Sequence, residues 1–307
     1  MRRRALLVSS IAAVPIGIGR ARSAPVVRVA YAGSMGVVMD RALGPSFTAA
    51  KGASYQGIGQ GAFALARLIA GHQLAADVFV SVTPGPVRVL QRAGLAGEAV
   101  PVASTDMVIA YAPKSRFGPQ MEAAAKGQAK WYDVLRAQGL RFGRTDPLTD
   151  PQGRNIVFTI MLAERFYDVP GLTKAVLGPL VNPAQIFTEP SLLSRLEGGQ
   201  IDASSAYRSA AVSHQLPFVS LPPEINLRDP SLDAAWYSKV SLSLPNPGGG
   251  TQVVRPEPLV FYAVVPTDAP NPALGREFVA YLTTAEGQKA FRDHGYGPPK
   301  GGALAGG

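Results

Sequence analysis

Apolar runs alternate with short turn-forming stretches along the chain, and this alternation predicts strands and helices in turn. Residues 26–31 form a β-rich run that ends in Ala-Gly-Ser-Met-Gly, and residues 37–47 carry apolar positions at helical spacing. A short strand at 53–56, a glycine-rich turn at 57–61 and a helix at 62–70 repeat the unit. Alternating units of this kind predict a doubly wound α/β sheet.

The later elements extend the pattern into a second domain. A buried strand at 76–81 ends in Ser81, and strands at 107–112 and 259–265 are expected to make the two crossings between domains. The remaining elements are a helix at 191–197, a strand-to-helix unit at 203–214 with Tyr207, a strand and loop at 218–227 with Glu224 at its tip, a glycine-proline loop at 246–250, a helix pair at 275–294 and a frayed tail at 301–307.

Polar and turn-forming residues interrupt the apolar sequence at 142–155 and lead directly into a helix. Each of two Asp-Pro steps forces extended backbone on its aspartate, so Asp150 is expected to cap a helix that begins at Pro151. Free backbone N–H groups and the helix dipole make such a helix start an anion site. Ser34 is expected at the carboxyl end of a parallel sheet, which is where open α/β sheets bind ligands. The alternative is that Asp150, Ser34 and Ser81 only cap helices.

The first 24 residues have the features of an export signal. Arginines at 2–4 precede an apolar run at 5–18 that is too short to span a bilayer, and small residues follow. The mature chain is therefore expected to begin near Pro25 and to be periplasmic or extracytoplasmic. A twin-arginine signal is an alternative export route.

Composition excludes several classes of function. The chain has 30 basic and 21 acidic residues, and five of the arginines belong to the expected export signal. The mature chain would therefore have a net charge of +4. It has no basic run that would indicate nucleic-acid binding. No cysteine is present, which excludes disulfides and thiolate metal sites, and the three histidines lack zinc-ligand spacing. About 280 residues exceed one ordinary core and indicate two domains.

Four pieces of the chain follow one another along the mature sequence: Ala32-Gly33-Ser34, Ala76-Asp77-Val78 leading to Ser81, Phe142-Gly143 through Asp150-Pro-x-Gly153, and Leu221-Pro-Pro-Glu-Ile-Asn-Leu227. In this order they resemble the periplasmic substrate-binding proteins of molybdate/tungstate importers of the ATP-binding-cassette class, and in particular their tungstate-type branch. The C-terminal run at 273–297 looks like the closing helix of the wider superfamily, so the resemblance covers essentially the whole mature chain.

The resemblance implies a type II binding protein, in which two α/β lobes with doubly wound sheets are joined by a two-strand hinge and close on an oxyanion. The implied division is a signal at 1–24, a first lobe from 25–107 and 259–307, and a second lobe at 108–258. Ser34 and Ser81 would donate hydrogen bonds to oxo groups, Asp150 and Glu224 would coordinate the metal centre, and Tyr207 is the tyrosine candidate. The implied protein is a monomer without catalytic activity or cofactor, and it delivers its cargo to a membrane permease.

Carboxylates beside an anion appear unfavourable, because like charges repel in a cleft of low dielectric. Molybdenum(VI) and tungsten(VI), however, are hard centres that can take additional oxygen ligands, whereas sulfur and phosphorus cannot. A pair of carboxylates would therefore accept molybdate or tungstate and repel sulfate and phosphate.

Three departures from the branch pattern leave alternatives open. Ala62 stands where a serine is usual, Arg154 stands where an aromatic residue is usual, and either Arg144 or Arg154 could pair with Asp150 and favour another anion such as sulfate, phosphate or thiosulfate. A secreted hydrolase that uses the two carboxylates is a further alternative, although only two tryptophans are available for stacking on sugars. Gly57-x-Gly59-x-x-Ala62 also matches a dinucleotide fingerprint, but Asp77 begins its strand instead of ending it.

Overall fold

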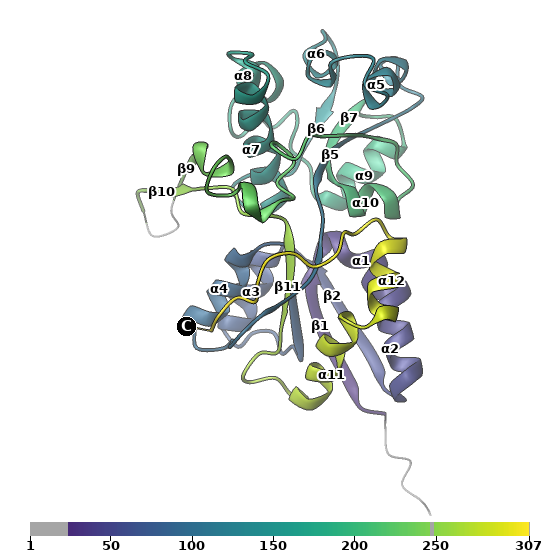
Figure 1. The fold of residues 1–307 in the computed structure, drawn as a ribbon, viewed down its shortest axis with the longest axis vertical. Helices are drawn as coiled ribbons and strands as arrows, with labels where there is room; N and C mark the ends of the chain where they lie inside the picture. Colours follow the sequence, from purple (N-terminus) through teal and green to yellow (C-terminus); the bar gives the residue numbers. More distant parts are fainter. Residues whose placement is uncertain (1–23, 246–248, 307) are drawn as a thin grey trace, which may run out of the picture.

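The computed structural model describes residues 24–245 and 249–306, and these form two α/β lobes, one above the other in Figure 1. The expected export signal and the tip of the expected loop at 246–250 lie outside the described residues. Lobe 1 has a five-stranded sheet in the order β2-β1-β3-β11-β4, in which β1 is parallel to β2 and β3, while β11 runs antiparallel to both of its neighbours. Its strands are β1 (Val26–Ala32), β2 (Ser54–Gln60), β3 (Val78–Ser81), β4 (Val100–Ser104) and β11 (Val260–Val264).

Helices cover the sheet of lobe 1 on both sides. Helices α3 and α4 pack on one side and on each other, and α2, α11 and α12 lie on the other side (Figure 1). The helices are α1 (Gly36–Val38), α2 (Gly44–Lys51), α3 (Ala62–Ala70), α4 (Pro84–Arg92), α11 (Pro272–Leu282) and α12 (Ala285–Asp293).

Lobe 2 has a four-stranded sheet in the order β6-β7-β5-β8, and a separate hairpin, β9 with β10, projects from it (Figure 1). The fold class expected from the sequence, two α/β lobes, is confirmed. The elements of lobe 2 are β5 (Met107–Tyr111), α5 (Gly118–Ala125), α6 (Trp131–Leu135), β6 (Phe142–Gly143), α7 (Pro151–Phe166), α8 (Leu172–Leu177), α9 (Glu189–Glu197), β7 (Ala203–Tyr207), α10 (Arg208–Ser213), β8 (Phe218–Ser220), β9 (Leu242–Pro245) and β10 (Thr251–Val254).

The chain passes between the lobes twice, and the two passages are side by side. The first joins β4 to β5 and the second leads into β11; the Thr105 N–H donates to the Leu259 carbonyl at 3.0 Å. The segment after β8 holds both passages, because the Asn226 carbonyl accepts from the Met107 N–H at 2.9 Å and the Leu227 carbonyl accepts from the Leu259 N–H at 2.8 Å. These backbone bonds form a compact connection between the two sheets.

Two local predictions were wrong. The segment 57–61, expected to be a glycine-rich turn, is mostly strand: β2 pairs with β1 as far as Gln60. A Cβ at Gly59 would lie 2.6 Å from the Tyr31 ring. The glycine therefore makes room for that ring and does not form a turn. The tail expected to fray is paired at Leu304, whose N–H and carbonyl exchange hydrogen bonds of 2.9 and 3.0 Å with Ala99.

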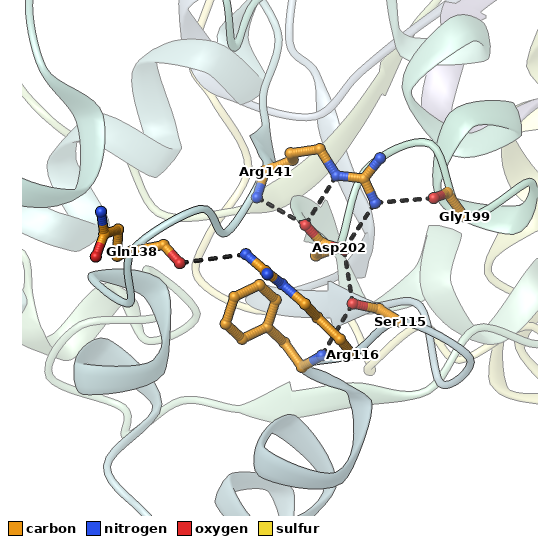
Figure 2. A network of polar contacts seen from close by, with 7 residues as sticks. Ser115, Arg116, Gln138, Arg141, Gly199 and Asp202 are labelled. Carbon is orange, nitrogen blue, oxygen red and sulfur yellow. Dashed lines mark hydrogen bonds and ion pairs between the residues drawn. The ribbon is translucent and has the colours of Figure 1, made fainter.

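A buried carboxylate fixes the strands that lead to the site in lobe 2 (Figure 2). Asp202 precedes β7 and accepts hydrogen bonds from the Arg141 backbone at 2.8 Å, from the Arg141 guanidinium at 2.8 and 3.0 Å, and from Ser115 Oγ at 2.6 Å. Burial raises the pKa of Asp202, but the hydrogen bonds from Arg141 and Ser115 outweigh it and lower the pKa overall. Asp202 therefore stays ionised and ties the starts of β6 and β7 together.

Candidate functional site

Lobe 2 presents Asp150 at the start of α7. Asp150 has extended backbone, with φ −123° and ψ 128°, and its Oδ1 accepts a hydrogen bond from the Gln152 N–H at 2.8 Å. Pro151 occupies the first helical position, where its missing N–H costs nothing. The predicted helix cap is therefore confirmed, and the same residue lines the space between the lobes.

The glycine of the Asp-Pro-x-Gly motif has a steric role. A Cβ atom at Gly153 would lie 2.5 Å from the Thr145 carbonyl oxygen and 2.7 Å from the Pro147 nitrogen. Both neighbours are backbone atoms, which cannot move aside as a side-chain tip can. Only glycine therefore allows the first turn of α7 to pack against the loop that leads to Asp150.

We expect Gly153→Ala to lower the free energy of unfolding by about 1–3 kcal/mol, because the added methyl group overpacks a site with no free space. Chemical denaturation of the two chains measures the difference. Gly36→Ala is the matched control: a Cβ at Gly36 meets nothing within 4 Å, so this helical glycine should be neutral or gain up to about 1 kcal/mol. Equal stability of Gly153→Ala and the parent chain would contradict the steric explanation.

A cavity of about 830 Å³ lies between the lobes and is lined from both sides. An adjoining recess shares several of these residues and adds Tyr207. No lysine or arginine lines the cavity within the described chain, although four acidic residues do. The polar residues that line the cavity or the recess include Ser34, Gln60, Thr145, Asp146, Asp150, Glu189, Glu197, Tyr207 and His214.

Glu189 is the second carboxylate next to Asp150, and it occupies the first position of α9. Its Oε1 accepts a hydrogen bond from Gln152 Nε2 at 3.4 Å, and a Cβ placed on Gly33 of lobe 1 would lie 3.5 Å from its Oε2. Glu189 therefore contacts the first turn of α7 and approaches the other lobe.

The two carboxylates disturb each other's ionisation. Burial, reinforced by the charge of Asp150, raises the pKa of Glu189 to about 8. Burial also raises the pKa of Asp150, although the hydrogen bond from the Gln152 N–H partly opposes this change. Two carboxylates that share one desolvated space resist ionising together. The pair therefore retains a proton at neutral pH.

Neutral hydrogen-bond donors surround the pair. The hydroxyl oxygen of buried Tyr207 accepts a hydrogen bond from Asn155 Nδ2 at 3.0 Å, so its proton is available to a ligand. Burial, together with the charge of Asp150, keeps the pKa of Tyr207 well above its usual value, so this residue acts as a donor. The buried Thr145 hydroxyl faces Asp150, and its interaction with that carboxyl opposes the rise in the pKa of Asp150.

Lobe 1 contributes Ser34 and the end of β2. Ser34 lies in a 3₁₀ turn directly after β1, and Gln60 ends β2 next to it in the cavity wall. Helix α3 then begins at Ala62, and no side chain caps its first backbone N–H groups. Because alanine has no hydroxyl, these backbone N–H groups are the donors that the helix start offers at this position.

Ser81 is not brought to the cavity. Its hydroxyl is fully buried and donates to the Thr83 carbonyl at 2.8 Å, just before α4 begins. Neither the cavity nor the adjoining recess has Ser81 in its wall.

Glu224 is also away from the cavity. It lies on the loop after β8, close enough to Tyr167 and Tyr237 for its charge to affect them. Burial raises the pKa of both tyrosines, and the charge of Glu224 adds to the increase. The Leu-Pro-Pro-Glu-Ile-Asn-Leu segment instead supplies the Asn226 and Leu227 carbonyls that hold the passages between the lobes.

The two nearby arginines have other partners. The buried Arg144 guanidinium donates to Gln185 Oε1 at 3.0 Å and to the Leu180 carbonyl at 2.9 Å, which ties the end of β6 to the loop that carries Glu189. Arg154 donates to backbone carbonyls of its own loop. Among the described residues, neither arginine forms an ion pair with Asp150 within 4.0 Å.

Sequence patterns did not indicate three residues of the cavity region, Glu189, Gln152 and Thr145. Gln152 could have been identified from its place inside the Asp-Pro-x-Gly motif. Thr188-Glu189-Pro190 has the residues of an ordinary helix start, so nothing local distinguishes Glu189 from any first-turn acid.

Within residues 24–245 and 249–306, no helix is both long and apolar enough to cross a bilayer. No group of three or more His, Cys, Asp and Glu side chains is arranged there to hold a metal ion.

Comparison with known proteins places the chain in a family. A model of the bacterial extracellular solute-binding proteins matches residues 27–297. A protein of Haloferax volcanii named for molybdenum binding in an ABC transporter is 34% identical over 255 residues, which are 82% of this chain and 76% of that protein. The molybdate/tungstate-binding protein of Pyrococcus abyssi is 31% identical over 211 residues, which are 62% of this chain and 59% of that protein.

A solved structure supports the same fold. The periplasmic molybdate-binding protein of Azotobacter vinelandii superposes with a TM-score of 0.61 at 13% identity, over 89% of this chain and all of the other. At this identity the likeness concerns the two-lobe fold alone. The match of the family model over residues 27–297 shows that the chain belongs to the bacterial extracellular solute-binding protein family.

Proposed function

We propose that this protein captures molybdate or tungstate outside the cytoplasm and delivers it to the membrane permease of an ABC importer, without catalysing a reaction. The observation that carries this proposal is the pairing of Asp150 with Glu189 in a cavity between two lobes whose described walls contain no lysine or arginine. The molybdate and tungstate names of its relatives support the same cargo.

The proposed geometry gives each lobe a separate role. Asp150 and Glu189 would each give one carboxylate oxygen to the metal centre, which can accept ligands beyond its four oxo groups. Ser34, the α3 N–H groups and Tyr207 would donate hydrogen bonds to those oxo groups. This assignment replaces Glu224 by Glu189 and leaves out Ser81, whose hydroxyl is already used.

The charge of the cavity supports this cargo over sulfate, phosphate or thiosulfate. An anion that cannot be coordinated would face two or more carboxylates without a lysine or arginine in the described wall. Catalysis by the same pair has less support, since the pair is enclosed by donors suited to hold a small anion. We further propose that the mature chain acts as a monomer whose lobes close on the ligand by rotation at the two passages.

A thermal-shift screen tests the proposal. Molybdate or tungstate at about 100 times its dissociation constant should stabilise the mature chain by about 2.7 kcal/mol, because it binds only the folded state. Sulfate, phosphate and thiosulfate serve as oxyanion controls, and ferric citrate tests a hard cation that the same oxygen ligands could hold. A rise in melting temperature with sulfate or ferric citrate, and no rise with molybdate or tungstate, would refute the proposed cargo.

A further inference from the structure

A contact between the lobes lies beside the oxyanion cavity and takes no part in lining it. Cζ of Arg154, in the first turns of α7, lies 5.2 Å from the centroid of the Phe63 ring, at the start of α3. The two residues line a separate cavity of about 460 Å³. Arg154 belongs to lobe 2 and Phe63 to lobe 1, so this cation–π contact spans the cleft.

The Arg154 guanidinium is held in place by hydrogen bonds within its own lobe, independently of its contact with the Phe63 ring. Its Nε donates to the Pro147 carbonyl at 2.8 Å and its Nη2 donates to the Leu148 carbonyl at 3.1 Å. Both carbonyls belong to the loop that leads to Asp150. A side chain fixed in this way loses little conformational entropy on contact and moves with the loop as one body.

Phe63 is adjacent in sequence to the part of lobe 1 that would bind the ligand. It follows Gly61 and Ala62, which stand in the wall of the recess next to Ser34. The contact therefore joins the helix start that would bind oxo groups to the loop that would bind the metal centre. It can exist only while these two parts are close together.

The surrounding charges make the contact moderate in strength. Burial lowers the pKa of Arg154, the charge of Arg67 one turn along α3 lowers it further, and Asp150 and Glu257 oppose the change. Arginine nevertheless remains protonated in proteins. A charged, partly desolvated guanidinium over an aromatic face is attractive, while Arg67 limits the gain.

We propose that the Arg154–Phe63 contact stabilises the closed conformation and thereby sets the affinity for the oxyanion, with neither side chain touching the ligand. The inference rests on the proposed function, and it makes Arg154 and Phe63 positioning residues. It also gives a reason for arginine at a position where an aromatic residue is usual. The measured dissociation constant equals the intrinsic one divided by the fraction of closed molecules, so loss of the contact weakens binding.

A double-mutant cycle measured by calorimetry with tungstate tests this role. Phe63→Leu and Arg154→Met should each raise the dissociation constant about 3- to 10-fold, the range that a partly desolvated cation–π contact supplies. The double variant should be no weaker than the weaker single variant, because both changes remove one contact. A merely structural role of Arg154 in its loop would make the effects multiply.

The chain offers a matched control for the cycle. Arg165 lies over the Trp236 ring at 5.9 Å, a cation–π contact made entirely within lobe 2. Arg165→Met should leave the dissociation constant for tungstate unchanged. Multiplying effects in the cycle, or an equal loss of affinity in Arg165→Met, would overturn the proposal while tungstate binding by the parent chain still supports the proposed function.

Small-angle scattering without any ligand gives a second, independent measurement. The radius of gyration should rise in Phe63→Leu and Arg154→Met and stay the same in Arg165→Met, because only the first two lose a contact between lobes. An unchanged radius in both would overturn the inference even if the parent chain bound neither molybdate nor tungstate.

Discussion

Tungstate binding is expected to weaken at least about 100-fold in Asp150→Asn and in Glu189→Gln, and to survive in Glu224→Gln. Each amide keeps the shape of the side chain but removes an anionic oxygen, and the loss of one buried charged partner commonly costs about 2–5 kcal/mol. Asparagine caps helices about as well as aspartate, so the melting temperature of ligand-free Asp150→Asn should barely move. Calorimetric titration of the three variants measures the effect.

Glu224→Gln is the decisive control, because the sequence alone favours Glu224 as the second ligand. A collapse of affinity in Glu224→Gln with unchanged affinity in Glu189→Gln would refute the assignment of Glu189. The double variant Asp150→Asn/Glu189→Gln adds a test of specificity. It should gain weak sulfate binding as it loses tungstate, since both repelling charges are gone.

Tungstate affinity is expected to fall about tenfold for each unit that the pH decreases from 8 to 6. The pKa of Glu189 is raised to about 8, so below that pH its carboxyl group holds a proton that must leave before the oxygen can coordinate a metal centre. Titrations between pH 6 and 8 measure this slope. Binding should also release close to one proton at pH 6, which appears as a dependence of the binding enthalpy on the buffer.

The stability of the ligand-free protein should change in the opposite direction with pH. The folded chain keeps the Glu189 proton up to pH 8, whereas the unfolded chain releases it near the usual value of 4.5. Folding therefore binds a proton between these values, and stability falls as the pH rises through this window by up to about 1.4 kcal/mol per unit. Glu189→Gln should lack this part of the slope; an identical slope in both chains would disprove the assignment.

Much of the fold, and two residues of the candidate site, could be predicted from local sequence patterns. Asp150 could be identified because two Asp-Pro steps, a proline at the first helical position and Gly153 all constrain the same few residues. Ser34 followed from its place after the first strand. These signals are local, and local geometry is what residue patterns record best.

Glu189 could not be found in this way, because its role depends on contacts between distant segments. Its sequence context is that of any helix start. Its position beside Asp150 depends on tertiary packing: Leu192 of α9 is buried in one cluster with Val108 of β5, and Arg144 anchors the loop before α9. Glu224 was favoured because the motif around it is distinctive, but Glu224 does not line the cavity or the recess. In the structure the same motif supplies the Asn226 and Leu227 carbonyls that hold the passages between the lobes.

Both proposed carboxylate ligands belong to lobe 2, and this arrangement has a kinetic consequence. An oxyanion that enters the open cleft meets Asp150 and Glu189 on one rigid body, so its capture should not require the lobes to close first. The hydrogen-bond donors of lobe 1 arrive only as the cleft shuts, and their effect should appear in the residence time of the ligand. Substitutions in lobe 1 should therefore alter dissociation, while those at the two carboxylates should also alter capture.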